Sequence, residues 1–180
     1  MAIIITIMVL EMKVPHGATL EALKPLMTVF LGYVLSFVYL AIYWNNHHHL
    51  LHTVRRVTGS ILWANMHLLF WLSLFPFVTG WMGENHFAPL PTLLYGIVLL
   101  MAGIAYFILQ GRILAAEGDH SVLKQAIGRD WKGKISVIAY STAICTAMKW
   151  SWIAWTIFIL VALMWLIPDR RIERALQKQE

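Results

Sequence analysis

Apolar residues in this 180-residue chain occur in long blocks that are separated by short polar patches. Such blocks are typical of helices that cross a membrane, because a backbone inside lipid must satisfy its own hydrogen bonds. We expect helices at residues 1–12, 26–43, 61–78 and 90–110, and two more within residues 135–167. The last block is too long for one crossing, and we divide it at a polar break formed by Lys149, Trp150 and Ser151.

The third block, residues 61–78, carries polar side chains inside it and helix-breaking residues near its end. Asn65 and His67 lie within the block, and polar groups inside a membrane normally face protein or water rather than lipid. Asn65 could join two helices by a hydrogen bond, or it could hold a helix that lines a pore. Pro76 and Gly80 are expected to end or kink the helix.

The composition indicates a membrane protein rather than a water-soluble one. Hydrophobic residues make up 59% of the chain and charged residues 13%, whereas a soluble domain carries about 25% charged residues. The mean hydropathy is +0.67. A single cysteine, Cys145, excludes an intrachain disulfide framework and a cysteine-rich metal site.

The positive charges are distributed unequally between the two sides of the predicted helices. With the N-terminus inside, the cytoplasmic segments hold 11 of the 14 Lys and Arg residues, and only Lys13, Lys24 and Lys149 lie opposite. Five crossings instead of six would divide the cations seven to seven. The positive-inside rule therefore favours six crossings with both termini inside. The same distribution argues that the basic pI of about 9.5 does not reflect nucleic-acid binding.

The first block, residues 1–12, is shorter than a membrane crossing requires. Twelve helical residues extend about 18 Å, while the hydrocarbon core of a bilayer is about 30 Å thick. A secretory signal peptide would have a basic n-region and a small-residue cleavage site, and the segment has neither. We interpret the block as the second half of a truncated first transmembrane helix.

The apolar residues of this first block follow a helical period. Ile3, Ile7 and Leu10 share one face at spacings i, i+4 and i+7, and Thr6 lies beside them. The face could pack against lipid or another helix, with the Thr6 hydroxyl bonded to its own helix. It could instead form a hydrophobic pore constriction, which discriminates between ions by the cost of removing their water. Periodicity alone leaves both interpretations open.

A run of histidines follows the second predicted helix. His47, His48, His49 and His52 follow Trp44 after two asparagines, and His48 and His52 have the i, i+4 spacing of zinc ligands. No acidic residue or cysteine lies nearby in the sequence to complete a metal site, so we expect no bound metal. Hydrogen bonding at the membrane interface is the favoured role, because amphipathic rings settle there.

The polar residues do not form a catalytic set that we can identify. The sequence has no glycine-rich phosphate loop, no ordered Ser-His-Asp arrangement and no pair of carboxylates within the apolar blocks. Glu11 lies at the edge of a crossing, where Lys13 and the aqueous interface can account for its charge. Residues 111–134 are expected to form a solvated cytoplasmic connection that could be partly helical. The pattern argues against an enzyme and against a proton-coupled transporter, and we expect no cofactor.

Four short motifs in a fixed order resemble a known family. The segments AIIITIMVLEMKVP, YWNNHH, LWAN and LFPFVTG look like the bacterial branch of the transmembrane protein 175 family, the endolysosomal-type potassium channels. The resemblance covers residues 1–110, and the last two predicted helices match only in length and hydropathy. Each motif is weak alone, but four in the right order and spacing are fairly specific.

The resemblance implies a homotetramer of six-helix subunits in which the first helix of each subunit lines a central pore. Carried over by position, it makes Ile3 the pore constriction, Thr6 part of a threonine layer that supports potassium preference, and Ile7 and Leu10 further apolar rings. The carbonyl-lined TVGYG filter of other potassium channels is absent from the sequence. The helical period had placed the three apolar residues on one face independently of the resemblance.

One family motif is missing from the chain. The first helix of the family opens with an arginine followed by an FSD triplet, and this sequence contains no FSD. In the family the motif ties the first helix to its neighbours, which makes Trp44, His47, His48 and Asn65 its expected partners. We expect that the chain lacks the beginning of its pore helix, through a mis-assigned start codon or because it is a fragment.

These observations predict an all-α, polytopic membrane protein with six transmembrane helices, the first one truncated, and both termini in the cytoplasm. Residues 1–168 should form one transmembrane channel domain, and residues 169–180 a short basic cytoplasmic tail. The expected function is passive, potassium-preferring cation transport across the bacterial plasma membrane, with potassium as the permeant ion and no nucleic-acid partner. The alternative is a non-conducting membrane interaction or scaffold protein that uses the same helices only for packing.

Overall fold

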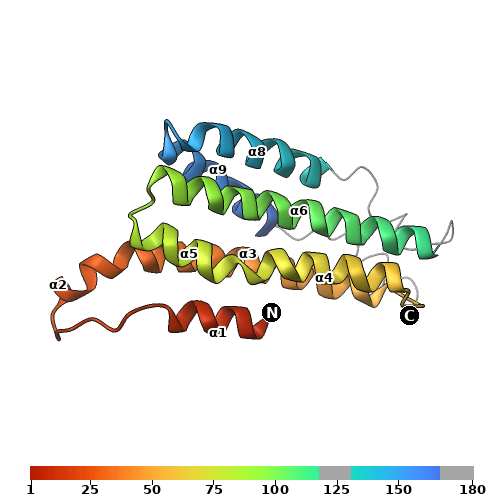
Figure 1. Ribbon diagram of the computed structural model, residues 1–180, viewed down its shortest axis with the longest axis horizontal. Coiled ribbons are helices and arrows are strands. Elements are labelled where there is room, and N and C mark those ends of the chain that lie inside the picture. Colours follow the sequence, from red (N-terminus) through yellow and green to blue (C-terminus); the bar gives the residue numbers. More distant parts are fainter. Residues whose placement is uncertain (118–130, 167–180) are drawn as a thin grey trace.

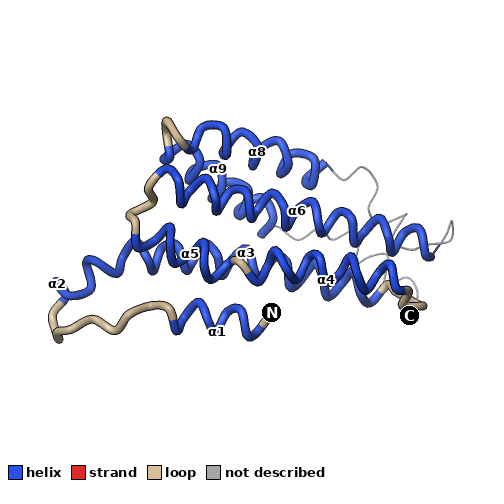
Figure 2. Tube along the Cα trace, viewed as in Figure 1, coloured by secondary structure: helices blue, strands red, loops and turns tan. Residues whose placement is uncertain are grey.

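The computed structural model describes residues 1–117 and 131–166, and these ranges contain helices and connections but no strand (Figures 1 and 2). The helices are α1 (Ala2–Leu10), α2 (Leu20–Leu23), the 3-10 turn η1 (Lys24–Leu26), α3 (Met27–His52), α4 (Gly59–Ser73), α5 (Phe75–Glu84), α6 (Pro89–Glu117), α8 (Trp131–Ala147) and α9 (Ser151–Leu166). Each of the six predicted segments is helical, which confirms the all-α prediction. The predicted tail, residues 169–180, lies outside the described residues.

Within residues 1–117 and 131–166, three helical stretches are long and apolar enough to cross a membrane: Leu20–His52, Gly59–Glu84 and Pro89–Glu117. Helix α9 is apolar but shorter, with 16 residues. The structure thus agrees with a polytopic membrane protein, while the six crossings and their orientation remain predictions.

Two predicted helix ends, at Tyr43 and Gln110, are wrong, because the first polar side chains after an apolar block do not mark the end of the helix. Helix α3 continues nine residues beyond Tyr43, to His52, so the histidine run lies on the helix and not after it. Helix α6 likewise continues past Gln110 to Glu117, into the segment predicted to be a connection. Neither extension contains proline, and a polar side chain does not interrupt the backbone hydrogen bonds of a helix that leaves the apolar layer.

The third predicted helix is interrupted near the expected proline. Helix α4 ends at Ser73, and α5 begins at Phe75 with Pro76 in its first turn. Proline is tolerated there because the first turn of a helix needs no backbone donor, whereas inside a continuous helix it would clash with the carbonyl four residues earlier. Gly80 lies inside α5 and does not end it, so the predicted interruption is confirmed at Pro76 only.

The polar break in the last apolar block is confirmed. Helix α8 ends at Ala147 and α9 begins at Ser151, with Lys149 and Trp150 in the turn between them. Figure 1 shows that α9 then runs back alongside α8, against which it packs.

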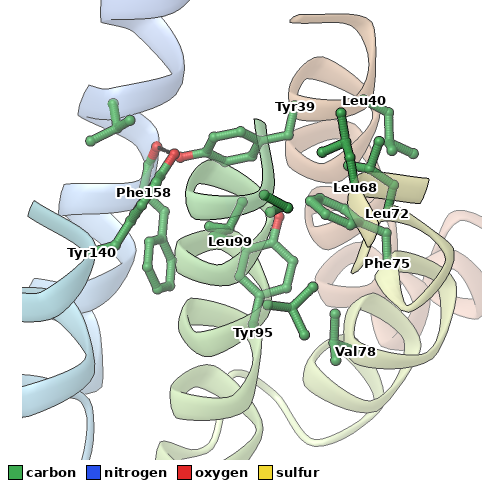
Figure 3. Close-up of a cluster of buried hydrophobic side chains, with 14 of the residues drawn as sticks. Tyr39, Leu40, Leu68, Leu72, Phe75, Val78, Tyr95, Leu99, Tyr140 and Phe158 are labelled. Carbon is green, nitrogen blue, oxygen red and sulfur yellow. Dashed lines mark hydrogen bonds between the residues drawn. The ribbon is translucent and has the colours of Figure 1, made fainter. Parts of the chain in front are cut away.

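Helix α6 occupies the middle of the bundle and contacts α4, α5, α8 and α9. Its buried residues Tyr95 and Leu99 lie between Phe75 on one side and Phe158 on the other (Figure 3). The Tyr95 ring centroid is 6.1 Å from that of Phe75 and 5.4 Å from that of Phe158. Gly96 permits this packing, because a Cβ there would come within 3.1 Å of both Ile144 and Phe158.

The core also contains a polar cluster that joins three helices. The buried Ser36 hydroxyl of α3 lies 2.7 Å from the hydroxyl of Thr79 in α5 and 2.9 Å from that of Tyr95 in α6. Because each hydroxyl has a partner, the cluster can be buried without a large desolvation cost, and it fixes how the three helices face one another.

The described cations lie in or beside a few segments of the bundle. Lys13 and Lys24 flank or belong to the segment with α2, and Lys149 lies in the α8–α9 turn. The other described Lys and Arg residues lie in the α3–α4 connection, the last part of α6 and the first turn of α8.

Candidate functional site

Helix α1 has one buried face and one exposed apolar face. Met8 is 3% exposed, and Ile4 and Ile5 pack against the core beside it. On the other side, Ile3, Ile7 and Leu10 are 74%, 42% and 81% exposed. At about 100° per residue these three lie within an arc of about 60°. The structure thus brings the three predicted pore residues onto a face that this chain leaves uncovered.

Thr6 lies at the edge of the exposed apolar face. Its hydroxyl donates a hydrogen bond of 2.8 Å to the carbonyl oxygen of Ile3 within the same helix. A hydroxyl has one donor hydrogen and two acceptor lone pairs, so this bond uses the hydrogen and leaves the oxygen able to face a cation. Bonding to its own helix and contact with an ion are therefore compatible roles for Thr6.

The position of α1 depends on α5 and α3, the helices that it contacts. Beyond the end of α1, the Lys13 ammonium forms an ion pair of 2.8 Å with Glu84 in the last turn of α5. The hydrogen bond to Glu84, reinforced by its negative charge, raises the pKa of Lys13. The sequence predicts Lys13 as a partner for the nearby charge of Glu11, but in the structure Lys13 pairs with Glu84 instead.

Glu11 itself lies against a glycine of α5. A Cβ at Gly80 would come 2.7 Å from the Oε2 atom of Glu11, so the missing side chain makes room for the carboxylate. Together with the Lys13–Glu84 ion pair, this contact holds the C-terminal end of α1 against α5. The sequence gives a partial signal for the contact, because Gly80 is a helix glycine without a turn to explain it.

Two of the four predicted supporting residues form a bond between helices. The Nε2 atom of His47 in α3 lies 2.6 Å from the Oδ1 atom of Asn65 in α4. A carboxamide oxygen only accepts hydrogen bonds, so Nε2 carries the proton and donates it. Of the two interpretations of Asn65, its joining of two helices is thus observed directly.

The other two supporting residues form a ring stack on the outer face of α3. The rings of Trp44 and His48 are stacked, with centroids 5.5 Å apart and an angle of 14° between their planes. His52 continues the column edge-on, 4.4 Å from His48. In the described part of the chain, no hydrogen bond or ring contact joins these residues or the His47–Asn65 pair to α1.

The described residues contain no group of three or more His, Cys, Asp or Glu side chains that could hold a metal ion. The histidine column offers two rings to a metal but no third ligand of these types. Stacking and hydrogen bonding are the interactions that the geometry shows.

Three membrane-length apolar stretches and an uncovered apolar helix face define the class: a polytopic helical membrane protein. Residues 1–76 match the model of the family described as endosomal/lysosomal potassium channel TMEM175. A potassium channel of Chryseobacterium sp. (strain P1-3) is 54% identical over 178 residues, which cover 99% of this chain and 93% of that protein. The chain belongs to the TMEM175 family of potassium channels.

Two further relatives share shorter segments. A potassium channel of Streptomyces collinus is 27% identical over 113 residues, covering 58% of this chain and 55% of that protein. A potassium channel of Chamaesiphon minutus is 33% identical over 89 residues, covering 46% of this chain and 44% of that protein. No solved structure matches the chain significantly. The family match, residues 1–76, contains all the predicted pore and supporting residues, which run from Ile3 to Asn65.

Proposed function

We propose that this chain is the subunit of a potassium-preferring cation channel in the bacterial plasma membrane. Four copies surround a pore, and α1 of each copy lines it. The subunit crosses the membrane six times with both termini in the cytoplasm, and potassium is the permeant ion.

The observation that carries the proposal is the division of α1 into two apolar faces. A helix that faces water carries polar residues on its exposed side, so an exposed apolar face needs lipid, another subunit or a narrow pore as its neighbour. In α1 the face with Met8 is buried, while Ile3 and Leu10 are at least 74% exposed at one edge of the bundle. A symmetric assembly around this edge would gather the exposed residues into rings.

The ring of Ile3 side chains would act as the constriction. An ion that passes an apolar ring loses part of its water, and potassium holds water less tightly than sodium, so the penalty favours potassium. Thr6 lies one turn further along, with its hydroxyl hydrogen already used, and its oxygen could partly replace the lost water. Such discrimination should be weaker than that of a carbonyl-lined filter.

Ion flux into liposomes tests the proposal. We expect the wild-type chain to conduct potassium faster than sodium, and Ile3→Asn to raise the total flux while lowering the potassium preference. Val9→Asn is the matched control, because Val9 is also exposed on α1, at 42%, but lies about 120° around the helix from Ile3. Unchanged selectivity in Ile3→Asn, or equal effects of the two variants, would reject the assignment of the constriction.

The scaffold alternative uses the same face for packing, and accessibility distinguishes the two. Single cysteines at Ile3, Ile7 and Leu10 should react with small aqueous thiol reagents if the face lines a pore, and should be inert if it is packed. Cys145 is exposed and must first be replaced by serine. Inert cysteines in a chain that does not conduct would favour the scaffold function.

A further inference from the structure

A groove of about 490 Å³ lies between α3, α6, α8 and α9. Its volume falls within the range of about 300–1,000 Å³ that is typical of small-molecule sites. Two of the residues that line it, Phe107 of α6 and Ile138 of α8, are 61% and 67% exposed, so the groove is open to the surroundings of the bundle. In Figure 1, α8 and α9 lie on one side of the bundle and α1 on the other, so the groove is separate from the candidate pore face.

The polar groups in the wall of the groove bond to the protein. The Tyr39 hydroxyl donates to the carbonyl oxygen of Phe158 at 2.6 Å. The Ser136 hydroxyl donates to its own helix and accepts the indole N–H of Trp165 at 2.8 Å. The Asn46 amide donates to the carbonyl oxygen of Ile42. With these groups satisfied, the deeper wall offers hydrocarbon and ring surfaces, which suit an apolar chain.

One end of the groove is cationic. Lys134, an exposed residue in the first turn of α8, lines the groove at this end. The Lys132 ammonium lies 5.8 Å from the ring centroid of Trp165 nearby. The first turn of α8 faces the end of the bundle that holds the α3–α4 connection, in which Arg55 and Arg56 lie, although α3, α4 and α6 extend beyond it (Figure 1).

We propose that the groove binds an anionic phospholipid, with an acyl chain among α3, α6 and α8 and the headgroup phosphate at Lys134. The solvent of a membrane protein is lipid, so an apolar groove open to it fills with acyl chain. Basic pockets between transmembrane helices select anionic headgroups. The cationic end is the one that the positive-inside rule assigns to the cytoplasm, so the lipid belongs to the inner leaflet. The proposal needs the membrane setting but not ion conduction.

Native mass spectrometry of the purified full-length chain tests this site. The protein is incubated with equal amounts of phosphatidylglycerol and phosphatidylcholine, and the retained lipids are counted. We expect the wild type to retain mainly phosphatidylglycerol. Lys134→Gln should lower this preference about fivefold, the effect expected for one cation near a lipid headgroup. Val137→Trp, which fills the groove, should reduce the retention of both lipids.

Matched controls separate the groove from the general surface. Lys149→Gln is the control for Lys134→Gln, because it removes another exposed lysine, just beyond the opposite end of α8. Ile135→Trp is the control for Val137→Trp, because it adds an indole to α8 outside the groove. The two replaced side chains are similarly exposed, Ile135 at 44% and Val137 at 40%. Both controls should retain lipid as the wild type does. Equal retention of the two lipids by the wild type, an unchanged preference in Lys134→Gln, or equal effects of the two tryptophans would overturn the proposal. Lys134→Gln changes only a surface side chain, so it remains informative if Val137→Trp does not fold.

Discussion

Gly83 of α5 sits directly against the backbone of α3, and its replacement by alanine gives a sharp test of the packing. A Cβ at residue 83 would lie 2.7 Å from the Cα atom of Val29 and 3.3 Å from its backbone nitrogen. Non-bonded carbon atoms rest at about 3.5–4.0 Å, so Gly83→Ala must separate the two helices by about 1 Å. No rotamer change relieves the clash, because both of these atoms belong to the backbone.

The cost of this separation can be bounded. Overpacking of this kind destabilises a protein by about 1–3 kcal/mol. For a chain of this length, each kcal/mol shifts the melting temperature by about 2–4 °C, so Gly83→Ala should melt roughly 2–12 °C below the wild type. The displacement should also reach α1, because α5 carries Glu84 and Gly80, which contact Lys13 and Glu11.

Thermal unfolding in detergent and potassium flux in liposomes measure the two effects. Gly111→Ala is the matched control, since Gly111 lies inside α6 and a Cβ there meets nothing within 4 Å. This control should gain up to about 1 kcal/mol from the better helix propensity of alanine and keep its flux. A Gly83→Ala protein that melts at or above the wild-type temperature would refute the close contact of α3 and α5.

Three other predictions concern Thr6 of α1, the His47–Asn65 bond and the Lys13–Glu84 ion pair. Thr6→Val keeps the shape of the side chain but removes its oxygen, so the potassium-to-sodium flux ratio should fall severalfold with little change in melting temperature; an unchanged ratio would remove Thr6 from the selectivity mechanism. Asn65→Leu leaves the Nε2–H of His47 without its partner and should lower the free energy of unfolding by about 1–2 kcal/mol. Addition of His47→Leu should recover part of that loss. Strictly additive losses in the double variant would contradict the bond. The Lys13 pKa is raised from its ordinary value of 10.5 by Glu84, so the stabilisation by this ion pair should be constant at neutral pH and disappear as the pH rises through the raised pKa. Above pH 6, the melting temperatures of the wild type and Glu84→Gln should therefore converge only in alkali, and convergence on acidification from pH 8 to pH 6 would contradict this sign.

The existence and type of the helices could be predicted from the sequence, but their ends could not. Apolar blocks predict helices because lipid forces the backbone to bond to itself, and the polar turn at Lys149 and Trp150 predicts the break before α9. The predicted ends at Tyr43 and Gln110 marked only where polar side chains begin. Helix α3 continues to His52 and α6 to Glu117, since polarity alone does not break a helix.

The sequence by itself determined that Ile3, Ile7 and Leu10 share a face, because the helical period depends only on residue spacing. Only the tertiary structure decided that this face is the uncovered one, since which side of α1 is buried depends on where α5 and α3 lie. Contacts between distant segments likewise came from the fold: Lys13 pairs with Glu84, 71 residues away, and not with its neighbour Glu11. The groove between α3, α6, α8 and α9 also depends on the tertiary structure, because its walls come from four helices and no local sequence pattern encodes a space between them.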